Sequence, residues 1–97
     1  MTSAYIIFIK EKTTDQRELD SYKSEVGKSF ENRDIAIRVA YGKQEVLEGP
    51  TSEGVVVLEF SDWDAAKNWY ESSSYQSALQ HRLAGAEYRA ILVEGRT

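Results

Sequence analysis

The run GVVVLEF, residues 54–60, carries four consecutive apolar side chains, from Val55 to Leu58. Successive side chains of a β-strand point to opposite faces of the sheet, so this run predicts a strand that is apolar on both faces. A chain of 97 residues has few helices with which to cover two sheet faces. The run therefore raises two questions: what covers the second face, and why Glu59 lies near the end of so apolar a segment.

The remaining segments predict three more strands and two helical regions. Segments 4–10, 35–41 and 88–95 are rich in β-branched and aromatic residues, which is typical of strands. Segment 13–32 predicts an amphipathic helix capped by Thr14 or Asp15. Its apolar stripe recurs at steps of three and four residues and consists of Leu19, Tyr22, Val26 and Phe30.

The second helical region, residues 61–86, is expected to consist of two pieces. Ser61, with Asp64 three residues later, resembles a capping box at its start, and the serines at 72–74 predict a break. In the first piece, Trp63 and Tyr70 are expected in the core, with Trp69 at the edge of the buried face. The stripe of the second piece comprises Tyr75, Ala78, Leu79, Arg82 and Ala86.

The order β-α-β-β-α-(α)-β contains two β-α-β halves and predicts one α+β domain over residues 1–97. This is the ferredoxin-like, or split βαβ, arrangement, in which a four-stranded antiparallel sheet carries its helices on one face. The other face should be polar if it meets water, but three of the four strands are apolar on both faces. We therefore expect a homodimer whose two sheets pack face to face, as a dimeric α+β barrel. The alternative is a monomer whose last helix crosses to the far face.

Several stretches resemble the domain-of-unknown-function family 1330, within the dimeric α+β barrel superfamily. The most specific part of the resemblance is residues 55–82. It begins with a Val-rich strand that ends in Glu59-Phe60 and continues with Trp69-Tyr70, a serine, Tyr75 and Arg82. The chain departs from the family pattern before its second strand, where ENRDIAIR lacks the usual glycine-rich turn. The similar stretches are AYIIFI (4–9), EVLEG (45–49), VVVLEF (55–60), AAKNWYESSSYQSAL (65–79) and HRLAGAEYRAILVEG (81–95). The resemblance implies a ferredoxin-like subunit and a dimer, and it implies no established reaction.

Composition excludes several classes of function. The formal net charge of −4 disfavours nucleic acid and polybasic membrane contacts as partners. The chain has no cysteine and a single histidine, so neither a thiolate nucleophile nor a multi-histidine metal site is expected. Haem occurs in the superfamily, but His81 as the sole axial ligand on a polar helix face makes it unfavourable, and we expect no cofactor. The apolar run at the N-terminus is too short for a secretory signal or a membrane span, so a cytoplasmic location is expected.

Glu59 and Arg38 form the first candidate site. Glu59 shares its face with Val57, which is predicted to look into the dimer interior, where an isolated carboxylate needs a partner. Arg38 shares parity with Ala36 and Ala40, small residues that leave room beside it. In the functional interpretation Arg38 holds an anionic substrate and Glu59 acts as a base. In the structural interpretation the two form an ion pair or reach solvent.

The other candidates lie on helices and on the first strand. Arg82, on an apolar stripe, either extends its stem along the core or binds a carboxylate. His81 has the ordinary pKa of a general base but no evident carboxylate partner, so a solvated surface position is the alternative. Tyr75, Tyr5 and Tyr22 are expected either to line one cleft or to serve packing alone.

These residues leave three functions open. The first is a cofactor-free enzyme acting on a small organic substrate, as the monooxygenases and isomerases of related barrel families suggest by analogy of fold. Convergence of Tyr75, Arg82 and Glu59 on one cavity would favour it. The second is a module that binds an anionic, aromatic or acyl metabolite without turnover, which needs the arginine but no positioned base. The third is a structural or assembly role, which predicts no cavity large enough for a ligand.

Overall fold

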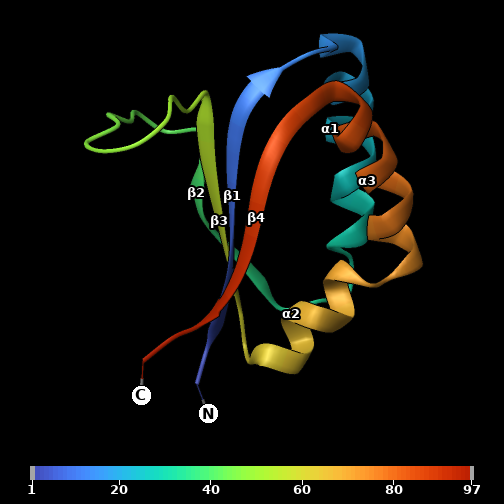
Figure 1. The fold of residues 1–97 in the computed structure, drawn as a ribbon. Helices are drawn as coiled ribbons and strands as arrows, with labels where there is room; N and C mark the ends of the chain where they lie inside the picture. Colours follow the sequence, from blue (N-terminus) through green and yellow to red (C-terminus); the bar gives the residue numbers. More distant parts are fainter. Residues whose placement is uncertain (1, 97) are drawn as a thin grey trace.

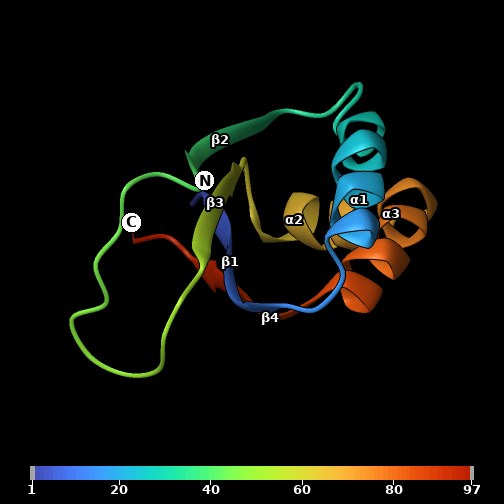
Figure 2. The same cartoon turned by 90° about the horizontal axis from the view of Figure 1, so that it is seen from above.

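The four strands form one antiparallel sheet in the order β2-β3-β1-β4, and all three helices lie on one of its faces (Figures 1 and 2). The structure is a computed structural model that describes residues 2–96. The elements in chain order are β1 (Ala4–Thr13), α1 (Gln16–Ser29), β2 (Ile35–Ala40), β3 (Gly54–Phe60), α2 (Trp63–Tyr70), α3 (Ser73–Gly85) and β4 (Ala86–Glu94). The predicted ferredoxin-like fold is thereby confirmed.

Short polar side chains cap the helices, because they accept hydrogen bonds from backbone N–H groups that have no partner inside the helix. Asp15 accepts from the backbone N–H of Arg17 at 3.0 Å and begins α1, one of the two predicted caps. The prediction that Ser61 caps α2 is wrong. Asp62 caps it instead, accepting from Ala65 N at 2.8 Å. The predicted break between the two helical pieces is confirmed, since α2 ends at Tyr70 and Ser72 caps α3.

The strand bounds match the predictions in β3 and nearly so in β2, whereas β1 ends later than predicted and β4, predicted over 88–95, spans 86–94. β3 spans residues 54–60 as expected, and β2 ends one residue early, at Ala40. β1 continues to Thr13, beyond the predicted 10, because Lys12 pairs with Glu87 and Thr13 with Ala86 at the start of β4. Glu53 Oε1 also accepts hydrogen bonds from Thr13 N at 3.0 Å and Thr13 Oγ1 at 2.6 Å. The register of β1 against β4 shifts between Lys10 and Lys12.

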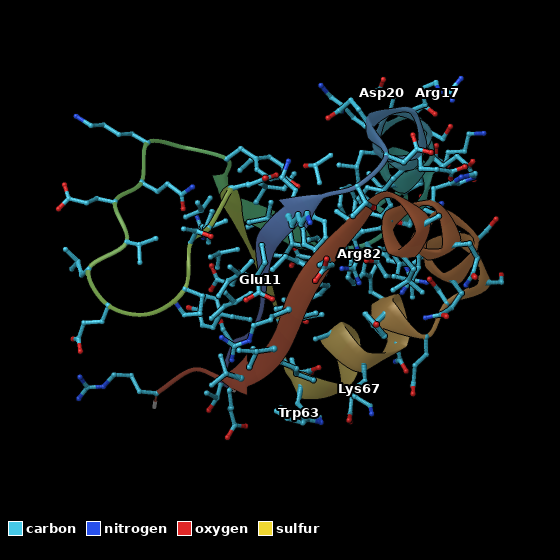
Figure 3. All side chains as sticks on the ribbon, turned by 45° about the horizontal axis from the view of Figure 1, so that its top comes forward. Glu11, Arg17, Asp20, Trp63, Lys67 and Arg82 are labelled. Atoms are coloured by element: carbon cyan, nitrogen blue, oxygen red, sulfur yellow. The ribbon has the colours of Figure 1, made fainter. Side chains whose placement is uncertain are left out.

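Trp69 occupies the centre of the core between the sheet and the helices. It is fully buried, and its ring packs against Phe8, Phe30, Phe60 and Tyr75. The prediction that Trp63 is a core residue is wrong, since Trp63 is 42% exposed (labelled in Figure 3). α2 has only eight residues, and its helical period allows either tryptophan to face the sheet. The packing of α2 on the sheet, in which Trp69 meets Phe8 and Phe60, decides between them.

The opposite sheet face is here called the outer face. It carries Tyr5, Ile7, Ile9, Ala36, Val39, Val55, Val57, Glu59, Arg89, Ile91 and Val93. None of the three helices covers it (Figure 2), and Ile91 and Val93 are 40% and 42% exposed. α3 lies beside α1 on the covered face, which excludes the alternative in which the last helix crosses to the far side. The segment 42–53 between β2 and β3 projects away from the helices (Figure 1).

Candidate functional site

A cavity of about 440 Å³ opens between the sheet and α1, a volume that suits a small organic ligand. All four strands contribute to its floor, and α1 forms the opposite wall. Most of the lining is apolar or aromatic, with a few cationic and polar side chains. The lining residues are Phe8, Lys10, Gln16, Leu19, Asp20, Tyr22, Lys23, Val26, Phe30, Ile37, Ala40, Tyr41, Val56, Leu58, Trp69, Arg82 and Tyr88.

Arg82 is the charged group at the inner end of this cavity. It projects from α3 into the space between sheet and helices (Figure 3) and is only 4% exposed. Its guanidinium carbon lies 5.2 Å from the ring centre of Phe8 and 4.8 Å from that of Tyr88, so two aromatic rings flank the cation. Its Nε is buried and has no hydrogen-bond partner within residues 2–96. A buried donor without a partner is costly, and a bound anion would satisfy it.

Two pairs of tyrosine hydroxyls surround Arg82. The hydroxyls of Tyr22 and Tyr75 lie 3.1 Å apart, and those of Tyr41 and Tyr88 also form a hydrogen bond. Burial, above all, raises the pKa of Tyr22, Tyr75 and Tyr88 above the ordinary value, while the positive charge of Arg82 acts in the opposite direction. These phenols therefore stay protonated near neutral pH and act as hydrogen-bond donors rather than bases.

Tyr41 stands at the mouth of the cavity, directly after β2. Its φ of 56° is in the left-handed region, which an aromatic residue rarely adopts, and its backbone N–H donates to Val55 O at 2.9 Å. Its ring packs where a side chain on Gly54 would stand, since a Cβ there would lie 2.3 Å from Tyr41 Cδ1. Lys10 Nζ lies 5.3 Å from the centre of the same ring. The glycine thus makes room for the ring at the mouth.

The sequence interpretation did not single out Tyr41, Tyr88 or Phe8 as lining residues. The alternation of side chains along β1 and β4 could have identified Phe8 and Tyr88, because both lie on the helix-facing side of their strands. On that side Phe8 pairs with Ala90 and Tyr88 pairs with Lys10. Tyr41 lies beyond the end of β2, so strand periodicity does not reach it.

Among the predicted site residues, Arg82 and Tyr22 line this cavity, and Tyr75 lies directly behind Tyr22. Tyr75 is fully buried, and its hydroxyl meets that of Tyr22 rather than the cavity itself. Glu59 and Tyr5 do not join them, because both lie on the outer face, on the other side of the sheet. The structure therefore does not bring Tyr75, Arg82 and Glu59 together in one cavity.

Glu59 instead forms a polar group with Arg38 and Tyr5 on the outer face. Arg38 Nε donates to Glu59 Oε1 at 2.7 Å, and the hydroxyl of Tyr5 lies 3.4 Å from Glu59 Oε2. The hydrogen bond from Arg38 is the main reason why the pKa of Glu59 lies below its ordinary value. The carboxylate is therefore ionised and already partnered, which describes an ion pair rather than a general base.

Arg38 reaches Glu59 through an irregularity in β2. The register against β3 shifts between Ile37 and Val39, so Ala36 pairs with Glu59 while Ala40 pairs with Val56 on the helix-facing side. The expectation that Arg38 shares one face with both Ala36 and Ala40 is wrong for Ala40. A β-bulge adds one residue to the strand and reverses the side on which later side chains lie.

His81 lies between two carboxylates of α1. Its Nδ1 is 2.7 Å from Glu18 Oε2, and its Nε2 is 2.8 Å from Glu25 Oε2. The hydrogen bond to Glu18, followed by the charge of Glu25, raises the pKa of His81 above its ordinary value. The sequence names no carboxylate partner for His81, and the structure supplies two. Glu18 and Glu25 are seven residues apart, two turns on one helix face, and only the packing of α3 on α1 brings His81 to them.

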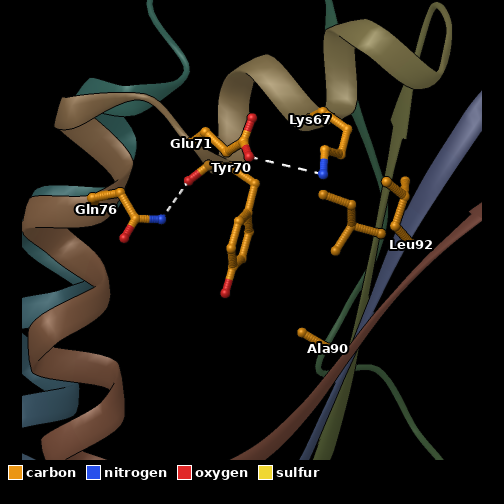
Figure 4. Close-up of a pocket in the computed structure, with 7 residues that line it drawn as sticks. Lys67, Tyr70, Glu71, Gln76, Ala90 and Leu92 are labelled. Carbon is orange, nitrogen blue, oxygen red and sulfur yellow. Dashed lines mark hydrogen bonds and ion pairs between the residues drawn. The ribbon is translucent and has the colours of Figure 1, made fainter.

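A second hollow, of about 580 Å³, lies between β4 and the start of α3 (Figure 4). Two polar contacts lie along it: Gln76 Nε2 donates to Tyr70 O at 2.7 Å, and Lys67 Nζ lies 3.8 Å from Glu71 Oε2. Ala90 and Leu92 supply apolar surface from β4. Since the hollow has no buried polar group without a partner, the Arg82 cavity is the better candidate for a ligand site.

Two further properties concern residues 2–96 as a whole. No cluster of three or more His, Cys, Asp or Glu side chains in this part of the chain has the arrangement of a metal site. None of the helices described is both long and apolar enough to cross a membrane.

The fold is shared with several solved structures. A protein of unknown function from Rhodopseudomonas palustris has a TM-score of 0.76 and 16% identity, covering 99% of this chain and 84% of that one. SnoaB, described as a cofactor-independent oxygenase from Streptomyces nogalater, has a TM-score of 0.67 and 11% identity, covering 100% and 96%. A dimeric ferredoxin-like protein of unknown function from Thermobifida fusca has a TM-score of 0.63 and 12% identity, covering 94% and 89%. At these identities the likeness shows the fold alone.

A search of curated proteins found no match. A family model does match, and it spans residues 3–96, nearly the whole chain and every helix and strand described above. The family that matches is the one that the sequence resembles. This chain therefore belongs to the DUF1330 family, which is defined by a domain of unknown function.

Proposed function

We propose that this protein binds a small organic anion with a planar, apolar body in the cavity between the sheet and α1, and that Arg82 holds the anionic group. The observation that carries the proposal is the buried Arg82 Nε without a partner beside an open cavity. A guanidinium group binds carboxylates through paired hydrogen bonds, and the rings of Phe8, Phe30 and Trp69 offer flat apolar surface to the rest of the ligand.

Binding without acid–base turnover fits this cavity better than proton abstraction does. A general base must lie within hydrogen-bond reach of the substrate and be unprotonated. The phenols near Arg82 have raised pKa values, and Glu59 is on the other side of the sheet, paired with Arg38. Asp20, the one carboxylate of the lining, is exposed on α1 and accepts a hydrogen bond from Gln16 Nε2. A purely structural role predicts a filled interior, whereas the cavity has a volume of about 440 Å³.

We also propose that the protein forms a homodimer through its outer face. Apolar side chains from β1, β3 and β4 lie on this face beside the Arg38–Glu59 pair, and no helix of residues 2–96 covers them. Burying such a face stabilises a dimer by about 25 cal/mol per Å² of apolar surface before association costs. Two structural neighbours, from Thermobifida fusca and Bacteroides fragilis, are described as dimeric. Glu59 enters the interface as an ion pair with Arg38, and the exposed Arg89, opposite Ile9, brings a further cation to this face.

The ligand proposal is tested with 2-naphthoate, a planar monocarboxylate, by isothermal titration calorimetry. We expect wild type and Arg17→Met, which removes an exposed arginine of α1, to bind equally. Arg82→Met keeps most of the apolar stem but removes the charge, and we expect it to bind at least about tenfold more weakly. Circular dichroism checks that both variants fold. Equal binding by Arg82→Met, or no binding by wild type, would overturn the proposal.

The dimer proposal is tested by the mass in solution. Wild type is expected at twice the chain mass of 11.0 kDa. Ile91→Glu places a charge on the outer face and is expected to give a folded monomer. Leu83→Glu, at an exposed site on α3, is expected to remain dimeric. A wild-type monomer at micromolar concentration would refute the dimer and leave the cavity proposal standing.

A further inference from the structure

The cavity is positively charged although the chain as a whole is not. Its lining includes three cationic side chains, Lys10, Lys23 and Arg82, and one carboxylate, Asp20. The formal net charge of the whole chain is −4. A local excess of positive charge in a concave, low-dielectric site attracts anions, and more than one positive group favours a ligand with more than one negative group.

The cations lie at two depths. Arg82 is buried and stacked between Phe8 and Tyr88. Lys10 is two residues beyond Phe8 on β1, so its side chain leaves the same sheet face about 7 Å further along the strand. Its Nζ lies over the ring of Tyr41 at the mouth. The cavity thus offers one cation at its inner end and another at its opening.

Lys23 adds a second cation at the opening from the opposite wall. It follows Tyr22 on α1 and lies one helical turn after Leu19, which also lines the cavity. Neither Lys10 nor Lys23 forms an ion pair with any residue from 2 to 96. The contact of Lys10 with Tyr41 uses the face of the ring and leaves its N–H groups free to donate. Asp20 accepts a hydrogen bond from Gln16 Nε2 at 3.0 Å.

We infer that the ligand is a dianionic aromatic acid with its two acidic groups at opposite ends of a planar body. This inference rests on the proposed function and specifies the ligand class of the same cavity. The inner carboxylate accepts hydrogen bonds from the guanidinium group of Arg82. The outer acidic group lies between Lys10 and Lys23. The body packs among Phe8, Phe30 and Tyr88, whose rings line the space between the two ends.

The test compares two probes with the same aromatic body, naphthalene-2,6-dicarboxylate and 2-naphthoate, by calorimetry on the full chain. We expect wild type to bind the dicarboxylate about tenfold more tightly than the monocarboxylate. In the double variant Lys10→Met with Lys23→Met, this preference should fall to about twofold or less, while 2-naphthoate binds as in wild type. The preference of wild type for the dicarboxylate should also weaken with added salt, because Lys10 and Lys23 lie at the opening of the cavity, where solvent ions screen their charges.

The matched control is Lys12→Met with Lys28→Met, which removes the same charge from exposed sites that do not line the cavity. This variant should keep the wild-type preference. Equal binding of both probes by wild type would overturn the inference. So would a control variant that loses the preference for the dicarboxylate as fully as Lys10→Met with Lys23→Met does. In both cases the proposed function stands. If wild type binds neither probe, the inference and the proposed function fail together.

Discussion

Arg38 Nε lies 2.7 Å from Glu59 Oε1 on the sheet face that no helix of residues 2–96 covers. This pair explains how a carboxylate can end the apolar run 54–60. Glu59 points to the outer face with Val55 and Val57, and Arg38 reaches it from the neighbouring strand at a β-bulge. The carboxylate therefore already has its partner before any second sheet packs against it, which lowers the cost of burying it.

The first prediction concerns the acid sensitivity of this pair. Since the folded-state pKa of Glu59 is lowered, its contribution to the free energy of unfolding is present above the ordinary value of 4.5 and is lost as the pH falls through the folded pKa. The melting temperature of wild type should exceed that of Glu59→Gln at pH 7, by a small margin because the pair is solvent-accessible in the single chain. The two should converge at low pH. A difference that stays constant from pH 7 to pH 3 would contradict the assignment.

The second prediction concerns His81 and has the opposite sign. Its folded-state pKa is raised, so its contribution to stability is complete below the ordinary value of 6.5 and is lost as the pH rises through the folded pKa. The advantage of wild type over His81→Gln in melting temperature should therefore decrease from pH 6 to pH 9. Because His81 is the only histidine, its imidazole resonances can be followed directly by NMR titration. A measured pKa below 6.5 would show that Glu18 and Glu25 do not pair with it in solution.

The third prediction concerns Gly54 and Tyr41. Gly54→Ala places a methyl group within the space of the Tyr41 ring and should cost roughly 1–3 kcal/mol of unfolding free energy. In a Tyr41→Gly background the same substitution should cost much less, since the ring is gone and the left-handed backbone of residue 41 suits glycine. Urea unfolding of the four proteins gives the coupling energy. Additive costs would mean that the ring does not occupy this position.

The fourth prediction separates the two tryptophans. Trp69→Ala removes the fully buried centre of the core and should cost roughly 3–5 kcal/mol. Trp63→Ala, at a site that is 42% exposed, should cost less than about 1 kcal/mol. Tryptophan fluorescence supplies a second readout, because the variant that keeps only Trp69 should show the more blue-shifted emission. Similar costs for the two variants would contradict the placement of α2.

The fold could be predicted from the sequence because it depends on local periodicity. The alternation in β3 defines two apolar faces, and the three- and four-residue steps from Leu19 to Phe30 define one helix stripe. The candidate site could be predicted only in part. Arg82 was singled out because a charge on an apolar stripe is unusual, but neither its cavity nor Tyr41 and Tyr88 could be read from the order of residues.

The sequence by itself determined the order of the elements and the presence of an apolar face that the helices leave open. Both follow from side-chain periodicity along single segments. Only the tertiary structure decided that Ala40 lies on the helix-facing side while Arg38 reaches Glu59 on the outer face, that His81 meets Glu18 and Glu25, and that Trp69 rather than Trp63 fills the core. These outcomes depend on a one-residue bulge in β2, the packing of α3 on α1 and the packing of α2 on the sheet. Such features arise between segments, and no periodicity within one segment encodes them.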